Sequence, residues 1–90
     1  MARYVVERTY PDGLKVPLTA EGARLVRSVI DHNNQSGVHW LYSYVSEDHR
    51  ISYDVYDGPN PDAIRKAAEC NALPVDRITK VSVLSPYSYR

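Results

Sequence analysis

The residues of this chain best suited to chemistry are two carboxylates, Glu7 and Asp54, set among tyrosines in segments that predict β-strands. A carboxylate can ligate a cation or act as a general base, and two nearby carboxylates can share a proton. The chain has eight Tyr, one Trp and no Phe. Because a buried Tyr hydroxyl needs a hydrogen-bond partner, this composition predicts a cavity or interface lined with hydroxyls. The alternative interpretation is that many of the tyrosines lie on the surface.

Residue alternation predicts which side chains share a face of the sheet. In segment 51–56, the aliphatic alternate set is expected to pack under the helices, which turns Asp54 and Tyr56 toward the open face. In segment 38–45, the same reasoning turns the aromatic alternate set toward the open face. Glu7 points to the open face from the first strand.

The hairpin register brings these residues together. A turn centred on Asp48 pairs Tyr42 with Asp54 and Trp40 with Tyr56, with Cβ atoms about 5 Å apart. The predicted ligand-binding residues are Glu7, Trp40, Tyr42, Tyr44, Asp54 and Tyr56. The two carboxylates are the predicted metal ligands. Because carboxylates among aromatic rings are costly to bury without partners, this surface is expected to be wet, filled by a ligand or paired across a dimer. Such a patch of large aromatics predicts a dimer interface that encloses a cavity, and a solvated sheet face is the alternative.

The elements that must position these residues follow the order strand, helix, strand, strand, helix, strand. β-Branched and aromatic residues predict strands at 3–10, 38–45, 50–56 and 77–84. Apolar spacing predicts helices at 20–35 and from 61 to about 71, capped by Thr19 and by Asn60 followed by Pro61. This order is typical of a ferredoxin-like α+β sandwich, a four-stranded antiparallel sheet of order 4-1-3-2 with both helices on one face. We expect one such domain over residues 1–90.

Composition narrows the classes of function. The 11 Lys and Arg balance the 11 Asp and Glu, which argues against a general nucleic-acid binder and against a polybasic membrane binder. No apolar run approaches the ~18 residues of a membrane-spanning helix, and Glu7 and Arg8 interrupt any signal-peptide core. One cysteine permits no internal disulfide. We therefore expect a cytoplasmic location, without nucleic-acid or membrane partners.

The remaining candidate ligands form no motif. His32, near a helix end, is expected to cap that end or lie on the surface, and His49 lies in the hairpin turn. His39 is expected to point inward in a structural role, although a site that combines it with His32 remains open. We interpret Cys70 as a buried or half-buried thiol rather than a nucleophile. No Ser–His–Asp set, Cys-x-x-Cys pair or phosphate loop is present, and no catalytic residue is assigned.

Five segments of the chain form a recognisable series: YVVERTYP at 4–11, WLYSYV at 40–45, VYDGP at 55–59, AIR at 63–65 and LPVDRI at 73–78. Together they resemble a family of small bacterial domains of unknown function described as nickel-binding proteins. The resemblance covers nearly the whole chain, with the segments in order. It implies a ferredoxin-like, dimeric protein.

The chain departs from that family at three positions. Many relatives carry His at position 42, Cys at position 54 and His at position 67, where this chain has Tyr42, Asp54 and Ala67. A facing His and Cys suit nickel, zinc or copper, whereas Tyr facing Asp is an oxygen-only set that favours a harder ion or no ion. The change could equally mark a subgroup that binds an organic ligand.

These observations lead to a primary hypothesis and two alternatives. The primary hypothesis is a small homodimeric binding protein that holds nickel, another divalent metal or a small ligand on the open sheet face. The first alternative is a cofactor-free enzyme of the dimeric α+β barrel type, with a carboxylate as general base for an oxygenated aromatic substrate. The second alternative is a structural dimer module in which the aromatics only pack.

Overall fold

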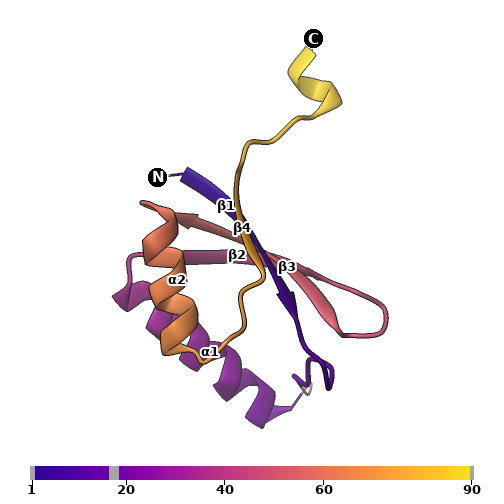
Figure 1. Ribbon diagram of the computed structural model, residues 1–90, viewed down its shortest axis with the longest axis vertical. Helices are drawn as coiled ribbons and strands as arrows, with labels where there is room; N and C mark the ends of the chain where they lie inside the picture. Colours follow the sequence, from indigo (N-terminus) through magenta and orange to yellow (C-terminus); the bar gives the residue numbers. More distant parts are fainter. Residues whose placement is uncertain (1, 17–18, 90) are drawn as a thin grey trace.

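A computed structural model describes residues 2–16 and 19–89, and it contains a four-stranded antiparallel sheet accompanied by helices (Figure 1). The elements are β1 (Ala2–Thr9), α1 (Ala20–Gln35), β2 (His39–Val45), β3 (Ile51–Gly58), α2 (Pro61–Cys70), β4 (Arg77–Val81) and the 3₁₀-helix η1 (Pro86–Tyr89). The order across the sheet is β2-β3-β1-β4, which is the predicted order counted from the other edge. The predicted ferredoxin-like α+β fold is confirmed.

Helix α2 provides the main cover of the sheet. The Asn60 side chain caps it by accepting a hydrogen bond from the backbone N–H of Ala63 at 2.9 Å, and Pro61 occupies the first turn, where its missing N–H costs nothing. The buried face of α2 includes Ile64 and packs close to the end of β3. A Cβ added at Gly58 would approach Ile64 Cδ1 to 3.1 Å, so glycine permits this close packing. The core cluster is Tyr4, Val6, Val38, Tyr56, Ile64 and Ala67.

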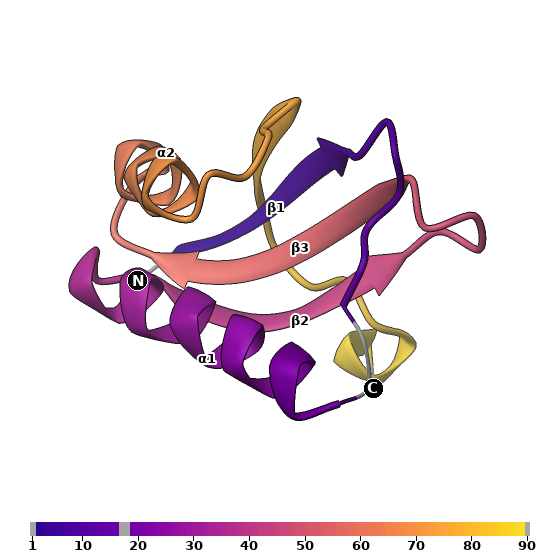
Figure 2. The ribbon, with the colours of Figure 1, turned by 90° about the horizontal axis from the view of Figure 1, so that it is seen from below.

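Helix α1 lies on the same side of the sheet, alongside β2 (Figure 2), but it is much less buried. Thr19 caps it as predicted, through a hydrogen bond from the Gly22 backbone N–H. Its apolar spacing predicts an inward face, yet Leu25 is 49% exposed and Ile30 is 42% exposed. The described part of α1 buries only Gly22 and Asn33. The sheet is therefore held chiefly by α2 and by its own side chains.

Strand β3 shows the opposite facing from the prediction. Ser52, Asp54 and Tyr56 are buried on the helix side, while Ile51 and Tyr53 are exposed on the open side. The facing follows from β1, since Tyr56 pairs with Tyr4 of the core and Asp54 pairs with Val6 of the core. Alternation then turns every intervening residue of β3 outward.

The hairpin register also differs by one residue. Trp40 pairs with Tyr56 as predicted, but an irregularity between Trp40 and Tyr42 places Tyr42 opposite Val55 rather than Asp54. This β-bulge puts Trp40 on the helix side and Tyr42 on the open side. The Trp40 indole N–H donates to Ser43 Oγ at 2.9 Å across the bulge.

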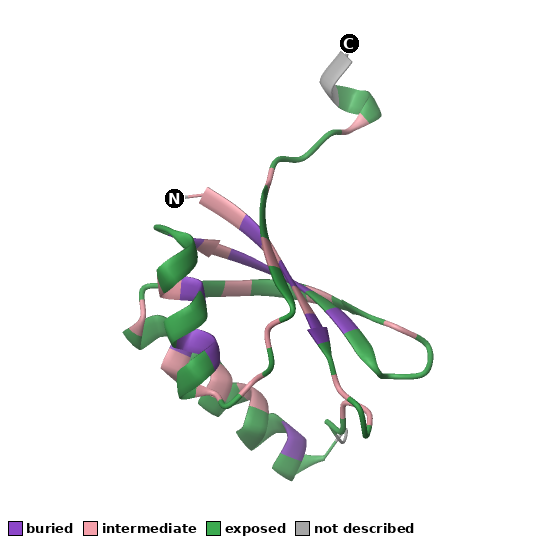
Figure 3. Ribbon diagram, in the orientation of Figure 1, coloured by how far each residue is buried: buried purple, intermediate pink, exposed green. Residues whose placement is uncertain are grey.

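The chain beyond β4 leaves the body of the fold. The predicted strand extends to residue 84, but β4 ends at Val81, the residue that pairs with Arg3 of β1. Val83 is 68% exposed and Leu84 is 78% exposed, and the segment points away from the sheet and helices (Figures 1 and 3). Among the described residues, no helix is long and apolar enough to span a membrane.

Candidate functional site

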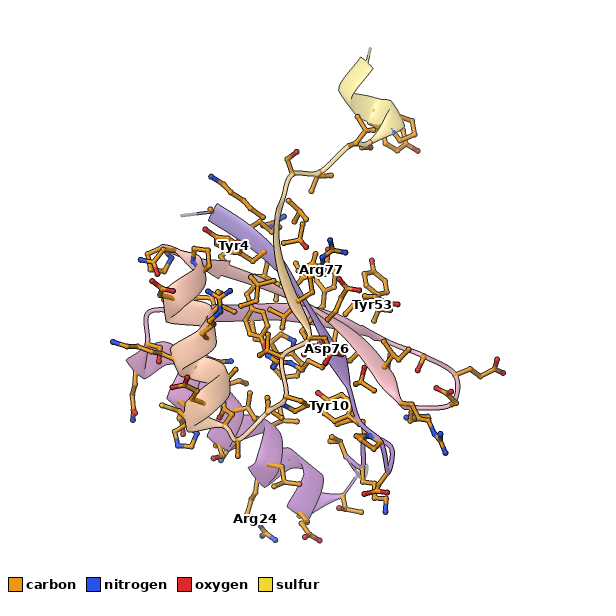
Figure 4. All side chains as sticks on the ribbon, viewed as in Figure 1. Tyr4, Tyr10, Arg24, Tyr53, Asp76 and Arg77 are labelled. Atoms are coloured by element: carbon orange, nitrogen blue, oxygen red, sulfur yellow. The ribbon has the colours of Figure 1, made fainter. Side chains whose placement is uncertain are left out.

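The open face of the sheet carries a row of four side chains, one from each strand. Tyr44 pairs with Tyr53 across β2 and β3, and Tyr53 pairs with Glu7 across β3 and β1. Glu7 pairs in turn with Arg77 of β4. Such paired side chains have Cβ atoms about 5 Å apart. Tyr53 points away from both helices (Figure 4), so the row combines two phenols, a carboxylate and a guanidinium on an uncovered surface.

A second row makes the centre of this face apolar. Tyr42 pairs with Val55, and Val55 pairs with Val5. The rings of Tyr42 and Tyr44 contact edge to face, with centroids 5.5 Å apart and an interplanar angle of 85°. Tyr44 is 65% exposed, although an aromatic pair of this size is normally buried against a neighbour. The aromatic side chains therefore form an open platform.

A third row carries charge. Arg3 Nε donates to Asp57 Oδ1 at 3.1 Å, and this hydrogen bond and the charge of the carboxylate raise the pKa of Arg3. His39 pairs with Asp57 from β2 and is exposed. The prediction that His39 points inward is wrong, because Trp40 takes the inward position beside it. The apolar centre of the face is thus bordered by charged residues on both sides along the strands.

A polar cluster lies on the opposite, helix-covered face. Arg8 is 1% exposed, and its Nε donates to Asp54 Oδ2 at 2.6 Å. Its other donors reach the Pro74 carbonyl oxygen at 2.7 Å and the Tyr56 hydroxyl at 3.1 Å. The guanidinium also lies 5.9 Å from the centre of the Tyr56 ring. Asp54 is therefore held in a buried ion pair and faces away from the open surface.

Burial favours the neutral form of two tyrosines in this cluster. Burial raises the pKa of Tyr56 above its ordinary value, and the nearby Arg8 charge opposes that rise. Burial likewise raises the pKa of Tyr10, whose hydroxyl accepts a hydrogen bond from Ser52 Oγ at 3.4 Å. Both phenols remain neutral at ordinary pH and serve as hydrogen-bond partners in the interior.

The structure separates the predicted site residues into two groups. Glu7, Tyr42 and Tyr44 lie on the open face as predicted. Trp40, Asp54 and Tyr56 lie on the helix side, so the prediction that all six share one surface is wrong. The sequence reasoning missed Tyr53, because it assigned the two alternate sets of β3 residues to the wrong faces of the sheet. It also missed Arg77, although the antiparallel pairing of the first and last strands could have placed it beside Glu7.

The other candidate ligands lie elsewhere. His32 Nδ1 is 2.7 Å from Asn71 Oδ1, and Asn71 Nδ2 donates to Asn33 Oδ1 at 3.1 Å, which joins the ends of α1 and α2. Cys70 is exposed, so the prediction of a buried or half-buried thiol is wrong. A groove of about 580 Å³ runs along α1, lined by Val16, Thr19, Gly22, Ala23, Val26, Arg27 and Ile30. It contains no carboxylate and does not belong to the open face.

The described residues of one chain do not form a metal-binding group. Over residues 2–16 and 19–89, no three His, Cys, Asp or Glu side chains gather closely enough to hold an ion. The predicted ligands Glu7 and Asp54 lie on opposite faces, and Asp54 is engaged by Arg8. Within the row from Tyr44 to Arg77, Glu7 supplies one carboxylate, so a cation there would need ligands from a second chain.

Comparison with known proteins agrees with the fold. The crystal structure of SCO4226 from Streptomyces coelicolor A3(2) matches with a TM-score of 0.72 and 14% sequence identity, covering 93% of this chain and 100% of that one. None of the curated protein sequences matches the chain. A family model described as "Nickel responsive protein SCO4226-like" matches residues 4–81. That span contains both helices and nearly all of the four strands of the sandwich, and the chain belongs to the SCO4226-like family of nickel responsive proteins.

Proposed function

We propose that the protein is a small homodimeric binding protein whose open sheet faces pack together and enclose a ligand site. The site consists of Glu7, Tyr42, Tyr44, Tyr53 and Arg77 from each chain. The observation that carries this proposal is the row from Tyr44 to Arg77, which places exposed phenols beside a carboxylate and a guanidinium on the uncovered face. Exposed aromatic patches of this kind mark interfaces and binding sites.

A second copy is the partner best suited to this face. Its apolar centre is bordered by both signs of charge, Glu7 and Arg77 on one side and Arg3 and Asp57 on the other. A surface that carries equal numbers of both charges can complement a copy of itself across a two-fold axis. Packing two such sheets face to face would cover aromatic area that one helical layer leaves exposed.

A divalent metal ion is the first ligand to test, because the family name supports a response to nickel. In the proposed dimer, two Glu7 carboxylates, one from each chain, would supply the charge, and tyrosine hydroxyls would orient or ligate. Such an oxygen-only set suits harder ions better than soft ones. An organic ligand would use the same residues, with Arg77 binding an acidic group and the phenols stacking or donating hydrogen bonds.

The experiment is a thermal-shift series on chelator-treated protein with nickel, zinc, copper, iron and magnesium. Binding to the native state alone raises the free energy of unfolding by roughly 2.7 kcal/mol at a hundred times the dissociation constant. We expect a saturable shift with one ion that Glu7→Gln removes. Glu47→Gln is the matched control, because Glu47 lies exposed in the hairpin turn, outside the paired strands.

The outcomes separate the possible functions. A shift that Glu47→Gln removes as well as Glu7→Gln would mean that the ion binds unspecifically to surface carboxylates. The absence of a shift with any ion would contradict the metal ligand and leave an organic ligand. If neither ions nor small carboxylates and phenols stabilise the dimer, the aromatic platform only packs, and the binding function is wrong.

A further inference from the structure

We propose that the open face binds a free aromatic amino acid, with the ligand carboxylate on Arg77, its ammonium group on Glu7 and its ring on Tyr53. This inference rests on the open-face ligand site proposed above and names the class of its organic ligand. Three side chains carry it, because they follow one another across the sheet in the order that such a ligand requires.

Glu7 and Arg77 are opposite charges that the sheet places side by side without joining them. They occupy directly paired positions of β1 and β4, and Glu7 is half-buried whereas Arg77 is exposed. Neither side chain forms an ion pair or a hydrogen bond with any part of the chain that the structure describes. An exposed ion pair between them would contribute little stability, so a ligand can engage both groups at small cost.

A second pair of opposite charges on the same face is already bonded within the chain. Arg3 Nε donates to Asp57 Oδ1 at 3.1 Å, again between directly paired positions of neighbouring strands. The two charges of that pair neutralise each other and offer little to a charged ligand. Proximity of opposite charges therefore does not by itself make a ligand site, and the unbonded groups of Glu7 and Arg77 distinguish their row.

A free amino acid matches the unbonded pair, because its α-carbon carries a carboxylate and an ammonium group together. The Arg77 guanidinium can donate two N–H groups to the carboxylate, and the Glu7 carboxylate can accept from the ammonium group. The ligand has no net charge, so its burial under a covering chain leaves no charge without a partner. A residue within a peptide, or at one end of it, lacks at least one of the two charges. The pair thus selects the free amino acid.

The third side chain of the row selects an aromatic amino acid. Tyr53 lies on the opposite side of Glu7 from Arg77, because β3 and β4 flank β1. An aromatic amino acid has its parts in the same order: carboxylate, ammonium-bearing carbon, ring. Neighbouring strands lie about 5 Å apart, a distance that one methylene group and a ring can span. Figure 4 shows Arg77 and Tyr53 on the side of the sheet away from the helices.

The tyrosines of this row have the exposed surface that a ligand ring needs. Tyr53 is 40% exposed, and Tyr44, its neighbour on β2, is 65% exposed. A ring placed over Tyr53 can stack on it or meet its edge, and the adjacent ammonium group gains a cation–π contact with the same phenol. An aliphatic amino acid would make the two charged contacts and lose the aromatic one.

The test is isothermal titration calorimetry on the chelator-treated wild-type protein with L-phenylalanine and three analogues that each lack one group. Hydrocinnamate lacks the ammonium group, phenethylamine lacks the carboxylate and L-alanine lacks the ring. We expect saturable binding of L-phenylalanine. The dissociation constant of each analogue should be at least about tenfold higher, because each analogue loses a charged or an aromatic contact.

Variants assign each charged contact to its residue. Glu7→Gln should weaken the binding of L-phenylalanine at least about tenfold and leave the binding of hydrocinnamate, which has no ammonium group, unchanged. Arg77→Gln should weaken L-phenylalanine binding as strongly and leave the binding of phenethylamine unchanged. Asp57→Asn is the matched control, because Asp57 is an open-face carboxylate already bonded to Arg3. It should bind L-phenylalanine as the wild type does.

The other outcomes overturn the proposal in distinct ways. Hydrocinnamate that binds as tightly as L-phenylalanine would show that Glu7 does not hold an ammonium group. Equal losses in Asp57→Asn and Glu7→Gln would show a general effect of surface charge. L-phenylalanine that fails to bind would contradict the ligand class. In that case a Glu7-dependent shift in the ion series above would leave the open-face site standing, whereas the absence of both would contradict the open-face binding function as well.

Discussion

Polar and aromatic side chains are buried on one face of this sheet and exposed on the other. On the helix side, Arg8, Asp54 and Tyr56 are buried and bonded to one another. On the open side, Tyr44 and Tyr53 keep 65% and 40% of their surface exposed. The buried group is a closed network that contributes to stability, whereas the exposed group is available for recognition. The comparison predicts that substitutions on the helix side lower the free energy of unfolding, whereas substitutions on the open side change dimerisation and ligand binding.

The largest expected effect comes from breaking the buried ion pair. Arg8→Ala leaves the Asp54 carboxylate buried without its partner, and we expect a loss of about 3–5 kcal/mol in the free energy of unfolding measured in urea. Arg65→Ala is the control, because Arg65 is 58% exposed in its ion pair with Asp62. If both variants unfold at the same urea concentration, the helix-side cluster does not stabilise the fold.

A smaller effect on the free energy of unfolding is expected when a single tyrosine hydroxyl is removed from one face or the other. Tyr56→Phe removes the acceptor that Arg8 Nη2 uses at 3.1 Å, and we expect a loss of about 1–2 kcal/mol in urea unfolding. Tyr53→Phe removes a hydroxyl from the open face and should leave the unfolding of the monomer unchanged. Equal losses in the two variants would contradict the contrast between buried and exposed phenols.

The stability at alkaline pH tests the burial of the Tyr56 phenol. Because burial raises the folded-state pKa of Tyr56 above the ordinary value of 10.0, the protonated phenol favours the folded state. That contribution is fully present below pH 10.0 and is lost as the pH rises through the higher folded-state pKa. We expect the thermal midpoint to fall above this pH, and to fall less steeply in Tyr56→Phe. A parallel decline in Tyr56→Phe and the wild type would show that other groups cause the alkaline loss.

The order of elements and the strand order were predictable, because alternation, helical spacing and caps at Thr19 and Asn60 are local signals. The facing of β3 was not predictable in this way. The aliphatic alternate residues of β3 lie on the open face and its polar alternate residues are buried on the helix side, because Arg8 on another strand neutralises Asp54. Alternation along one strand carries no information about such a partner, and the bulge after Trp40 shifts the hairpin by one residue. Glu7 and Tyr44 were placed correctly because neither assignment depends on β3.

The most direct measurement is sedimentation equilibrium of the wild type, Tyr53→Lys and Leu25→Lys. Tyr53 lies on the open face between Tyr44 and Glu7, whereas Leu25 is a similarly exposed apolar residue on α1. We expect the wild type and Leu25→Lys to be dimers and Tyr53→Lys to be a folded monomer with an unchanged far-UV spectrum. A wild type that remains monomeric throughout the micromolar range, or a Tyr53→Lys variant that dimerises like the wild type, would contradict the assignment of the open face as the interface that encloses the ligand site.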